Sequence, residues 1–443
     1  MFSAAKHMLV FLLLFTLSPL NGQAMIVQLE GYVNADLLLA GERQILWSLS
    51  YSGVSSYELI SLDAQNGKEQ WRVKMEDRPH NVVVGGQDVF YFISGDFLTA
   101  ARLSSSQVLW RTNLSAVPQQ VKALPPKPSS RKGDSLVEPI SVLNFGYSLV
   151  PNRFNYSEIQ INGPLIVIDR KGLNGSGCVW DVCFQDWLVI DRRVGKIVDG
   201  GPGEILAHGK NLVVGNQEAA FQFKDGVKVP MPKLAEMHKS MNPFSRQGKR
   251  NDVNDWVLVS RTHTTTGPVA AFNVKSQTTV DLKLGHRDPC QQGWIVLKDG
   301  FLRYSEYHSS GFPDAKTTTE KFWIELYNFE GNLRAERTTE AFKDFWTSSL
   351  GVNSRGTVLL DVKDSLVTVE IPSLEMKRWQ TKPGASFHMT ESGDRMVCVR
   401  GDWSAQTMAK ASERREVIIT GVDAITFAPI WEHREKVTAK KLR

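Results

Sequence analysis

Four cysteines are the residues of this 443-residue sequence whose type and spacing first suggest chemistry. Cys178 and Cys183 flank the segment Val-Trp-Asp-Val, a spacing that allows a disulfide across a turn or between neighbouring strand ends. Cys290 and Cys398 lie far from this pair in the sequence. No second close cysteine pair or spaced histidine pair completes a zinc site with them. Cys178 with Cys183 is therefore a candidate disulfide, and the connectivity stays open.

Histidines and paired acids are the other candidates for chemistry. They comprise three dispersed histidines and two aspartate pairs, namely His263, His286, His308, Asp181 with Asp186, and Asp361 with Asp364. The histidines have the residue type for metal ligation, and the aspartates for acid–base work. Surface histidines and turn-capping aspartates explain the same residues without a site. The sequence has no serine nucleophile elbow and no phosphate-binding loop, so we assign no catalytic, cofactor-binding or metal-binding residue.

The N-terminus predicts export. Residues 1–24 combine Lys6, an apolar run from Met8 to Leu17, and a Gly-Gln-Ala end, as in a cleavable signal peptide. The apolar run is shorter than the roughly 20 residues that span a bilayer, although an uncleaved anchor stays an alternative. We expect a periplasmic or extracellular protein with no transmembrane span in the mature chain. The net charge of +5 does not suggest a nucleic-acid partner.

Short runs of β-branched and aromatic residues, separated by Gly, Asn, Asp and Ser, dominate the chain and predict an all-β fold. The clearest predicted strands are Gln44–Ser50, Tyr57–Leu62, Val82–Ile93, Leu165–Asp169, Trp187–Asp191, Asn211–Val214, Trp256–Ser260 and Thr357–Val362.

The stretch from Leu62 to Val73 shows how the strands are organised. Asp63 ends one apolar run, Gly67 lies in a turn, and Trp71 opens the next strand, which is the pattern of a hairpin corner. Such corners recur along the chain, at Leu62–Val73, Arg102–Thr112, Ile190–Gly200, Phe221–Pro230, Phe272–Leu282, Tyr327–Arg337, Val369–Thr381 and Val422–His433. Their spacing suits a four-stranded repeat with variable loops.

The first corner resembles the Leu-Asp-Ala-x-Thr-Gly-Lys-x-x-Trp repeat of the quinoprotein-type β-propellers, also called pyrroloquinoline-quinone-like repeats. Only Asn66 departs from the motif over Leu62 to Trp71, whereas the later corners match less well. The resemblance implies that a tryptophan of each blade docks on its neighbour, here Trp71, Trp110, Trp379 and Trp431. Asp63 and Asp191 can cap their turns, and Gly67 and Gly195 can take the left-handed conformation.

These features predict a single β-propeller over 25–443, built from four-stranded antiparallel blades. Eight blades are favoured and seven are the alternative. A strand from Ile26–Leu29 could latch onto the last blade, around Glu416–Val422. The Pro-rich stretch 117–139 and the stretch 230–255 read as insertions, the latter with a short helix over Leu234–Ser240, and 434–443 reads as a basic tail.

Function is less constrained than fold. We expect a non-enzymatic scaffold that binds a partner protein through rim loops, above all the two insertions, or through the axial funnel. The resemblance also implies an alternative, a quinone- or metal-dependent oxidoreductase, although the sequence lacks the adjacent cysteine pair of many such enzymes. A carbohydrate-binding propeller using Trp180, Trp187 or Trp403 is a further alternative. Asn113, Asn155 and Asn174 lie in glycosylation sequons, whose use depends on the source organism.

Overall fold

A computed structural model gives the structure of the chain. It describes residues 33–51, 56–86, 88–116, 153–156, 159–176, 179–207, 212–216, 218–240, 255–260, 269–284, 291–307, 322–339, 347–362, 365–381, 385–390, 392–401 and 415–437. The predicted signal peptide and the whole stretch 117–139 lie outside the described residues.

Antiparallel strands follow one another along the described chain and form eight sheets. The first four sheets contain β1 (Val33–Ala40), β2 (Gln44–Tyr51), β3 (Ser56–Asp63) and β4 (Glu69–Met75); β5 (Pro79–Val84), β6 (Val89–Ser94), β7 (Phe97–Arg102) and β8 (Val108–Asn113); β9 (Arg153–Tyr156), β10 (Gln160–Asn162), β11 (Leu165–Ser176), β12 (Val179–Asp191) and β13 (Ile197–Pro202); and β14 (Glu204–Ala207), β15 (Val213–Gly215), β16 (Ala220–Lys224) and β17 (Val227–Pro230). The last four contain β18 (Trp256–Ser260), β19 (Val269–Asn273) and β20 (Thr278–Asp281); β21 (Gln291–Leu297), β22 (Gly300–Tyr307), β23 (Phe322–Tyr327) and β24 (Leu333–Thr339); β25 (Thr347–Val352), β26 (Val358–Val362), β27 (Ser365–Glu370) and β28 (Glu375–Gln380); and β29 (Ala385–Met389), β30 (Arg395–Gly401), β31 (Arg415–Asp423) and β32 (Pro429–Val437).

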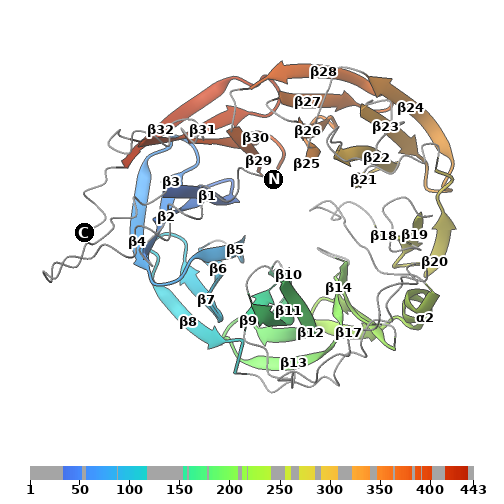
Figure 1. Ribbon diagram of the computed structural model, residues 1–443, viewed down its shortest axis with the longest axis horizontal. Coiled ribbons are helices and arrows are strands. Elements are labelled where there is room, and N and C mark those ends of the chain that lie inside the picture. Colours follow the sequence, from blue (N-terminus) through green and yellow to red (C-terminus); the bar gives the residue numbers. More distant parts are fainter. Residues whose placement is uncertain are drawn as a thin grey trace, which may run out of the picture.

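The sheets are arranged in a ring, with the first strands of each sheet toward the centre and the last strand on the outside (Figure 1). The predicted all-β class is confirmed, and the arrangement is consistent with a β-propeller. Two described sheets depart from four strands. In the third, β9 and β10 share one edge of β11, and the fifth has three described strands.

Neighbouring sheets cover both faces of the middle strands, so successive apolar residues of these strands are buried on opposite sides. In β2, Ile45 and Trp47 pack toward the last sheet, whereas Leu46 between them packs toward the second sheet. All three side chains are almost completely buried, and burial of a large aliphatic side chain contributes about 1.5–3 kcal/mol. Outer strands carry more polar residues, as the exposed side of β4 shows.

Each predicted corner coincides with the hairpin between the last two strands of one described sheet. The reason is that a tight turn is encoded by adjacent residues, so the local pattern suffices to place it. The number of blades in the whole chain stays a prediction, whereas the repeated hairpin is an observed feature.

Two sequence boundaries were wrong. The predicted strand Val82–Ile93 is two strands, because the chain turns after β5 and the N–H of Gly85 donates to the carbonyl of Val89 at 2.7 Å. Residues 434–437 of the predicted tail belong to β32, where Arg434 pairs with Ile418 in the ladder. The insertion predicted from about 230 to 255 starts at the last residue of β17, Pro230.

Helix α2 (Pro232–Ser240) is present where a short helix was predicted from Leu234. Leu234 and Ala235 are buried in a cluster with Ala220 of the fourth sheet and Phe272 of the fifth. The helix therefore fills part of the seam between these sheets. None of the described helical residues forms a segment with the length and apolarity needed to cross a membrane.

The ring closes between the first and last sheets by side-chain packing. Strands β1 to β4 form the first described sheet and β29 to β32 the last, so neither borrows a described strand from the other. Ile45 and Ile60 of the first sheet share one core with Val399 and Ile419 of the last. The predicted latch residues Ile26–Leu29 lie outside the described chain. Their predicted target is wrong, because β31 already pairs with β30 and β32 on its two edges.

Candidate functional site

The corner of the first sheet is held by its own aspartate. The backbone N–H groups of Gln65 and Asn66 donate to Asp63 Oδ1 at 2.8 and 3.2 Å. The N–H of Gly67 donates to the Asp63 carbonyl at 2.8 Å, and Gly67 has a φ of 71°, in the left-handed region that favours glycine. These hydrogen bonds close the turn, so Asp63 and Gly67 both have a structural role there.

The corner of the third sheet has the same geometry. The N–H of Arg193 donates to Asp191 Oδ1 at 2.8 Å, and Gly195 has a φ of 71°. The Arg193 side chain also pairs with Asp191 and lowers the pKa of that carboxyl. A β-carbon built on Gly195 would lie 2.5 Å from Cε3 of Trp110. The glycine thus serves both the turn and the close approach of the preceding sheet.

Three indole N–H groups cross the seams in the same way. Each donates to a backbone carbonyl in the corner of the next sheet around the ring. The donor and acceptor pairs are Trp71 with Leu103 (2.7 Å), Trp110 with Arg192 (3.2 Å) and Trp431 with Ala64 (2.9 Å). An indole therefore joins burial of its rings to one directional bond at each of these seams.

Trp379 lies at the seam between the last two sheets, and its side chain is among the exposed large hydrophobic ones. Its side chain is 43% exposed, and its ring centroid lies 4.8 Å from that of Phe427, in the corner of the last sheet. Trp187, one of the candidate sugar-binding tryptophans, is 2% exposed, and its Nε1 donates to the Pro202 carbonyl. A buried indole of this kind has no face to offer a sugar.

Several sequence candidates fall outside the described residues. These are Cys178, His263, His286, His308, Asp364 and Trp403, together with the side chains of Trp180, Asp181 and Cys183. The Cys178–Cys183 disulfide therefore stays a prediction. Of the sequon asparagines, Asn113 and Asn155 are exposed, whereas Asn174 lies on β11.

Asp186 has a partner that the sequence did not reveal. The Arg170 guanidinium donates to Asp186 Oδ1 at 2.9 Å and Oδ2 at 2.6 Å, and both side chains are almost completely buried. The two residues face each other directly on β11 and β12. Arg170 also donates to the Leu114 carbonyl of the preceding sheet. Asp186 is thus part of a buried ion pair within the third sheet, and Arg170 links this pair to the preceding sheet.

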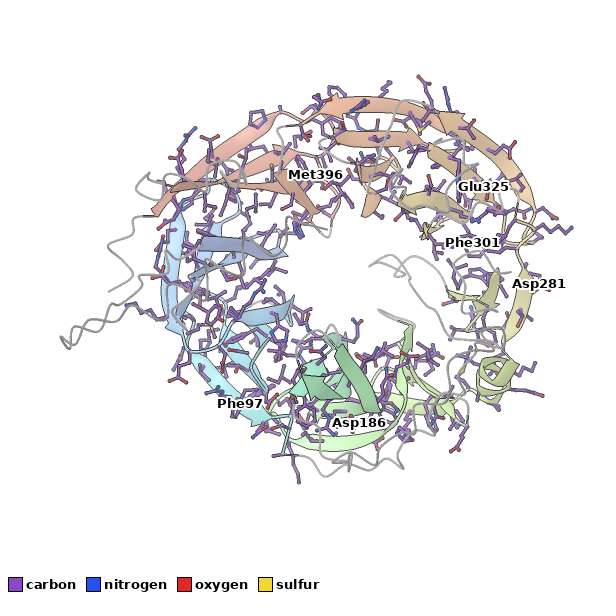
Figure 2. All side chains as sticks on the ribbon, viewed as in Figure 1. Phe97, Asp186, Asp281, Phe301, Glu325 and Met396 are labelled. Atoms are coloured by element: carbon purple, nitrogen blue, oxygen red, sulfur yellow. The ribbon has the colours of Figure 1, made fainter. Side chains whose placement is uncertain are left out.

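A second buried ion pair occupies the sixth sheet. Arg303 donates to Glu325 Oε2 at 2.8 Å, with both side chains fully buried and facing each other on β22 and β23. The Tyr327 hydroxyl donates to the same carboxylate, and Arg303 lies over the ring of Trp323 at 4.6 Å. Figure 2 labels Asp186 and Glu325 on different sheets of the ring. Both ion pairs are buried and hydrogen-bonded within the core, as structural ion pairs are.

Among the described residues, one group has the composition of a metal site. Glu69, His433 and Glu435 bring their ligand atoms within 4.8 Å of one another. They lie on β4 and β32, on the two sides of the closing seam.

The ring has two different ends. We call the end that holds the eight hairpin corners the corner end, and the opposite end the connection end. Because strand direction alternates, the last strand of each sheet runs toward the connection end, and the chain crosses to the next sheet from there. Both predicted insertions follow such strands, β8 and β17. The two stretches therefore leave the ring at the same end.

The hairpin of β11 and β12 projects toward the connection end. Its strands pair from Leu165 with Asp191 to Ser176 with Val179, whereas β13 accompanies β12 only as far as Asp186. On the other edge, β9 accompanies β11 only as far as Leu173. We call the described residues 174–176 and 179–184 the hairpin arm. At about 3.3 Å per residue, the arm continues roughly 20 Å past β13.

No protein-family model matches the sequence, and no curated protein matches it. Similar solved structures include BamB from Moraxella catarrhalis, with 12% identity over 80% of this chain and 78% of that one and a TM-score of 0.37. Dihydro-heme d1 dehydrogenase NirN in complex with DHE has 10% identity, coverage of 95% and 76%, and a TM-score of 0.49. Quinohemoprotein alcohol dehydrogenase ADHIIG from Pseudomonas putida HK5 has 9% identity, coverage of 91% and 68%, and a TM-score of 0.37. Likenesses this distant say nothing of what the chain does.

Proposed function

We propose that this chain is a non-enzymatic propeller scaffold that binds a partner protein at the connection end. The hairpin arm carries the proposal, because its two strands continue beyond their neighbours at the end from which both predicted insertions leave. In the same proposal, the eight described sheets are the eight blades of one exported propeller.

The arm has the features of a protein-binding element. Among the described residues, each of its strands pairs only with the other, so each has an outer edge with backbone donors and acceptors. A free strand edge binds an extended segment of another protein by continuing the ladder. A rigid ring beneath the arm fixes its direction and lowers the entropy lost on binding.

The corner end is suited to a structural role instead. Its turns are closed by backbone hydrogen bonds such as those from Gly67 to Asp63 and from Gly195 to Asp191, both at 2.8 Å. Indole N–H groups from the preceding sheets occupy further carbonyls there. Fewer backbone groups therefore remain for a partner.

Trimming the arm tests the proposal. The variant removes residues 174–181 and joins Leu173 to Val182, which face each other in the ladder, through a two-residue Asn-Gly turn. We expect partner adducts, detected by cross-linking in the cells that produce the protein, to disappear while the melting temperature stays unchanged. Unchanged adducts from a folded trimmed protein would refute the role of the arm.

Photo-cross-linkers at matched positions separate the two ends. Glu76 and Glu218 are exposed next to the connection end, and Ser105 and Lys275 are exposed in corners. We expect adducts from the first pair and none from the second. Adducts from the corner positions alone would place the partner at the other end.

The quinoprotein alternative has a separate test. Mixing the purified protein with pyrroloquinoline quinone and calcium, followed by gel filtration, would reveal a bound chromophore. We expect none, because the proposed function needs no cofactor. A stoichiometric chromophore would replace the scaffold proposal with the oxidoreductase.

A further inference from the structure

The seam where the ring closes holds a cluster of charged side chains. Arg72 of β4 donates to Glu58 Oε2 at 2.8 Å, to Glu69 Oε2 at 2.7 Å and to Glu435 Oε2 at 2.9 Å. Glu58 and Glu69 belong to the first sheet, whereas Glu435 belongs to the last. The guanidinium therefore bridges the two sheets, and these bonds raise the pKa of Arg72.

Carboxylates outnumber guanidinium groups among the described side chains of this cluster. Glu58, Glu69 and Glu435 all accept from the one guanidinium of Arg72. The side chains of Glu58 and Glu435 are only 10% and 12% exposed, so water screens their charges poorly. Carboxylates in such a setting attract a divalent cation.

His433 supplies the second observation. Its Nε2 atom is buried and makes no hydrogen bond among the described residues, and it lies 3.9 Å from Glu435 Oε2. The imidazole contacts Trp47 edge-on, with ring centroids 6.2 Å apart. A buried nitrogen with no bonding partner is costly unless something else uses its lone pair.

We propose that His433, Glu435 and Glu69 bind a divalent transition metal, with zinc as the best match. One imidazole nitrogen and two carboxylate oxygens are ligands that zinc accepts, and a fourth position stays open for water. The ligand atoms already lie within 4.8 Å of one another.

Arg72 is compatible with this metal. Each carboxylate oxygen has two lone pairs, so an oxygen that accepts from the guanidinium can also bind a cation. Arg72 donates to both oxygens of Glu69 and of Glu435, which holds the two carboxylates in fixed orientations. Bonds of this kind orient metal ligands in proteins.

The metal would act as a clamp on the ring. Its ligands come from β4 in the first sheet and β32 in the last, which share no described strand. A metal that binds only the folded ring stabilises it by mass action. This role is independent of partner binding at the connection end.

Thermal unfolding of the full chain with zinc chloride or with a chelator tests the clamp. At zinc concentrations about a hundredfold above the dissociation constant, we expect the melting temperature to rise by about 3 °C at neutral pH. His433→Gln should lose this rise, whereas His80→Gln, on β5 and outside the cluster, should keep it. No rise in the wild type, or an equal rise in His433→Gln, would overturn the proposal.

A second variant and a spectroscopic measurement distinguish loss of the metal site from misfolding. Glu69→Gln removes a partly exposed ligand and leaves the buried core of the seam intact. We expect it to lose the zinc response and the visible absorption of bound cobalt(II) together. Cobalt absorption that is unchanged in both Glu69→Gln and His433→Gln would show that the metal binds elsewhere, and would likewise overturn the proposal.

Discussion

The backbone of Gly67 lies directly against the indole of Trp431, since a β-carbon built on this glycine would lie 2.5 Å from Cε3 of the ring. Gly67 belongs to the first corner and Trp431 to the last sheet. The turn and the packing at the closing seam therefore both require that residue 67 has no side chain.

Gly67→Ala should destabilise the protein through both left-handed strain and a clash with Trp431. We expect a loss of about 2 to 5 kcal/mol in the free energy of unfolding. Gly356→Ala is the matched control, because Gly356 has a φ of 84° and open space around its β-carbon position. It should lose only about 1 to 2 kcal/mol. Equal losses in urea unfolding would show that the indole contact contributes nothing.

Trp71→Ala should loosen the seam between the first two sheets. Its indole stacks on Phe90 and donates to the Leu103 carbonyl, so truncation should cost roughly 3 to 5 kcal/mol. Trp71→Phe should cost about 1 kcal/mol for the lost bond, plus some packing. Trp379→Ala should cost less than Trp71→Ala because Trp379 is 43% exposed. The melting temperatures of the three variants check this order, and an unchanged value for Trp71→Ala would contradict it.

Arg303→Met should cost about 3 to 5 kcal/mol, because it leaves the fully buried Glu325 carboxylate without its cation. Adding Glu325→Gln to this variant should recover part of the loss, since the amide oxygen can still accept from the Tyr327 hydroxyl. A double-mutant cycle in urea measures the coupling. Strictly additive losses would show that the two charges do not depend on each other.

Glu204→Gln should stabilise the protein at neutral pH. Burial raises the pKa of Glu204 above its unfolded value, so the folded state favours the protonated acid. Stability from this group is present at low pH and is lost as the pH rises from the unfolded pKa, about 4, through the raised folded pKa. The gain from glutamine should therefore appear above that range and vanish near pH 3. A pH series of melting temperatures that shows no gain at pH 7 would contradict this prediction.

The corners could be predicted from the sequence because the residues that form them are close together in the chain. Asp63, Gly67 and Trp71 lie within nine residues, so one short window contains the turn and the docking residue. By the same logic, the Gly85 turn inside the predicted strand Val82–Ile93 was overlooked because strongly apolar residues surround it.

Partners that meet only in the folded ring could not be read in this way. Arg303 and Glu325 are 22 residues apart, and Arg72 and Glu435 are 363 apart. Their pairing depends on strand register and on which sheets become neighbours. The length of the hairpin arm is likewise a property of pairing between β11 and β12, which the composition of either strand does not specify.

Each described sheet consists of strands that are consecutive in the sequence. The ring therefore does not require any particular sheet to be the first in the chain. Linking the end of β32 to the start of β1, and opening the chain between β17 and β18, would preserve every described ladder and seam. A circular permutant of this kind should therefore fold to the same ring. The order of the sheets around the axis would survive although their order along the chain had changed.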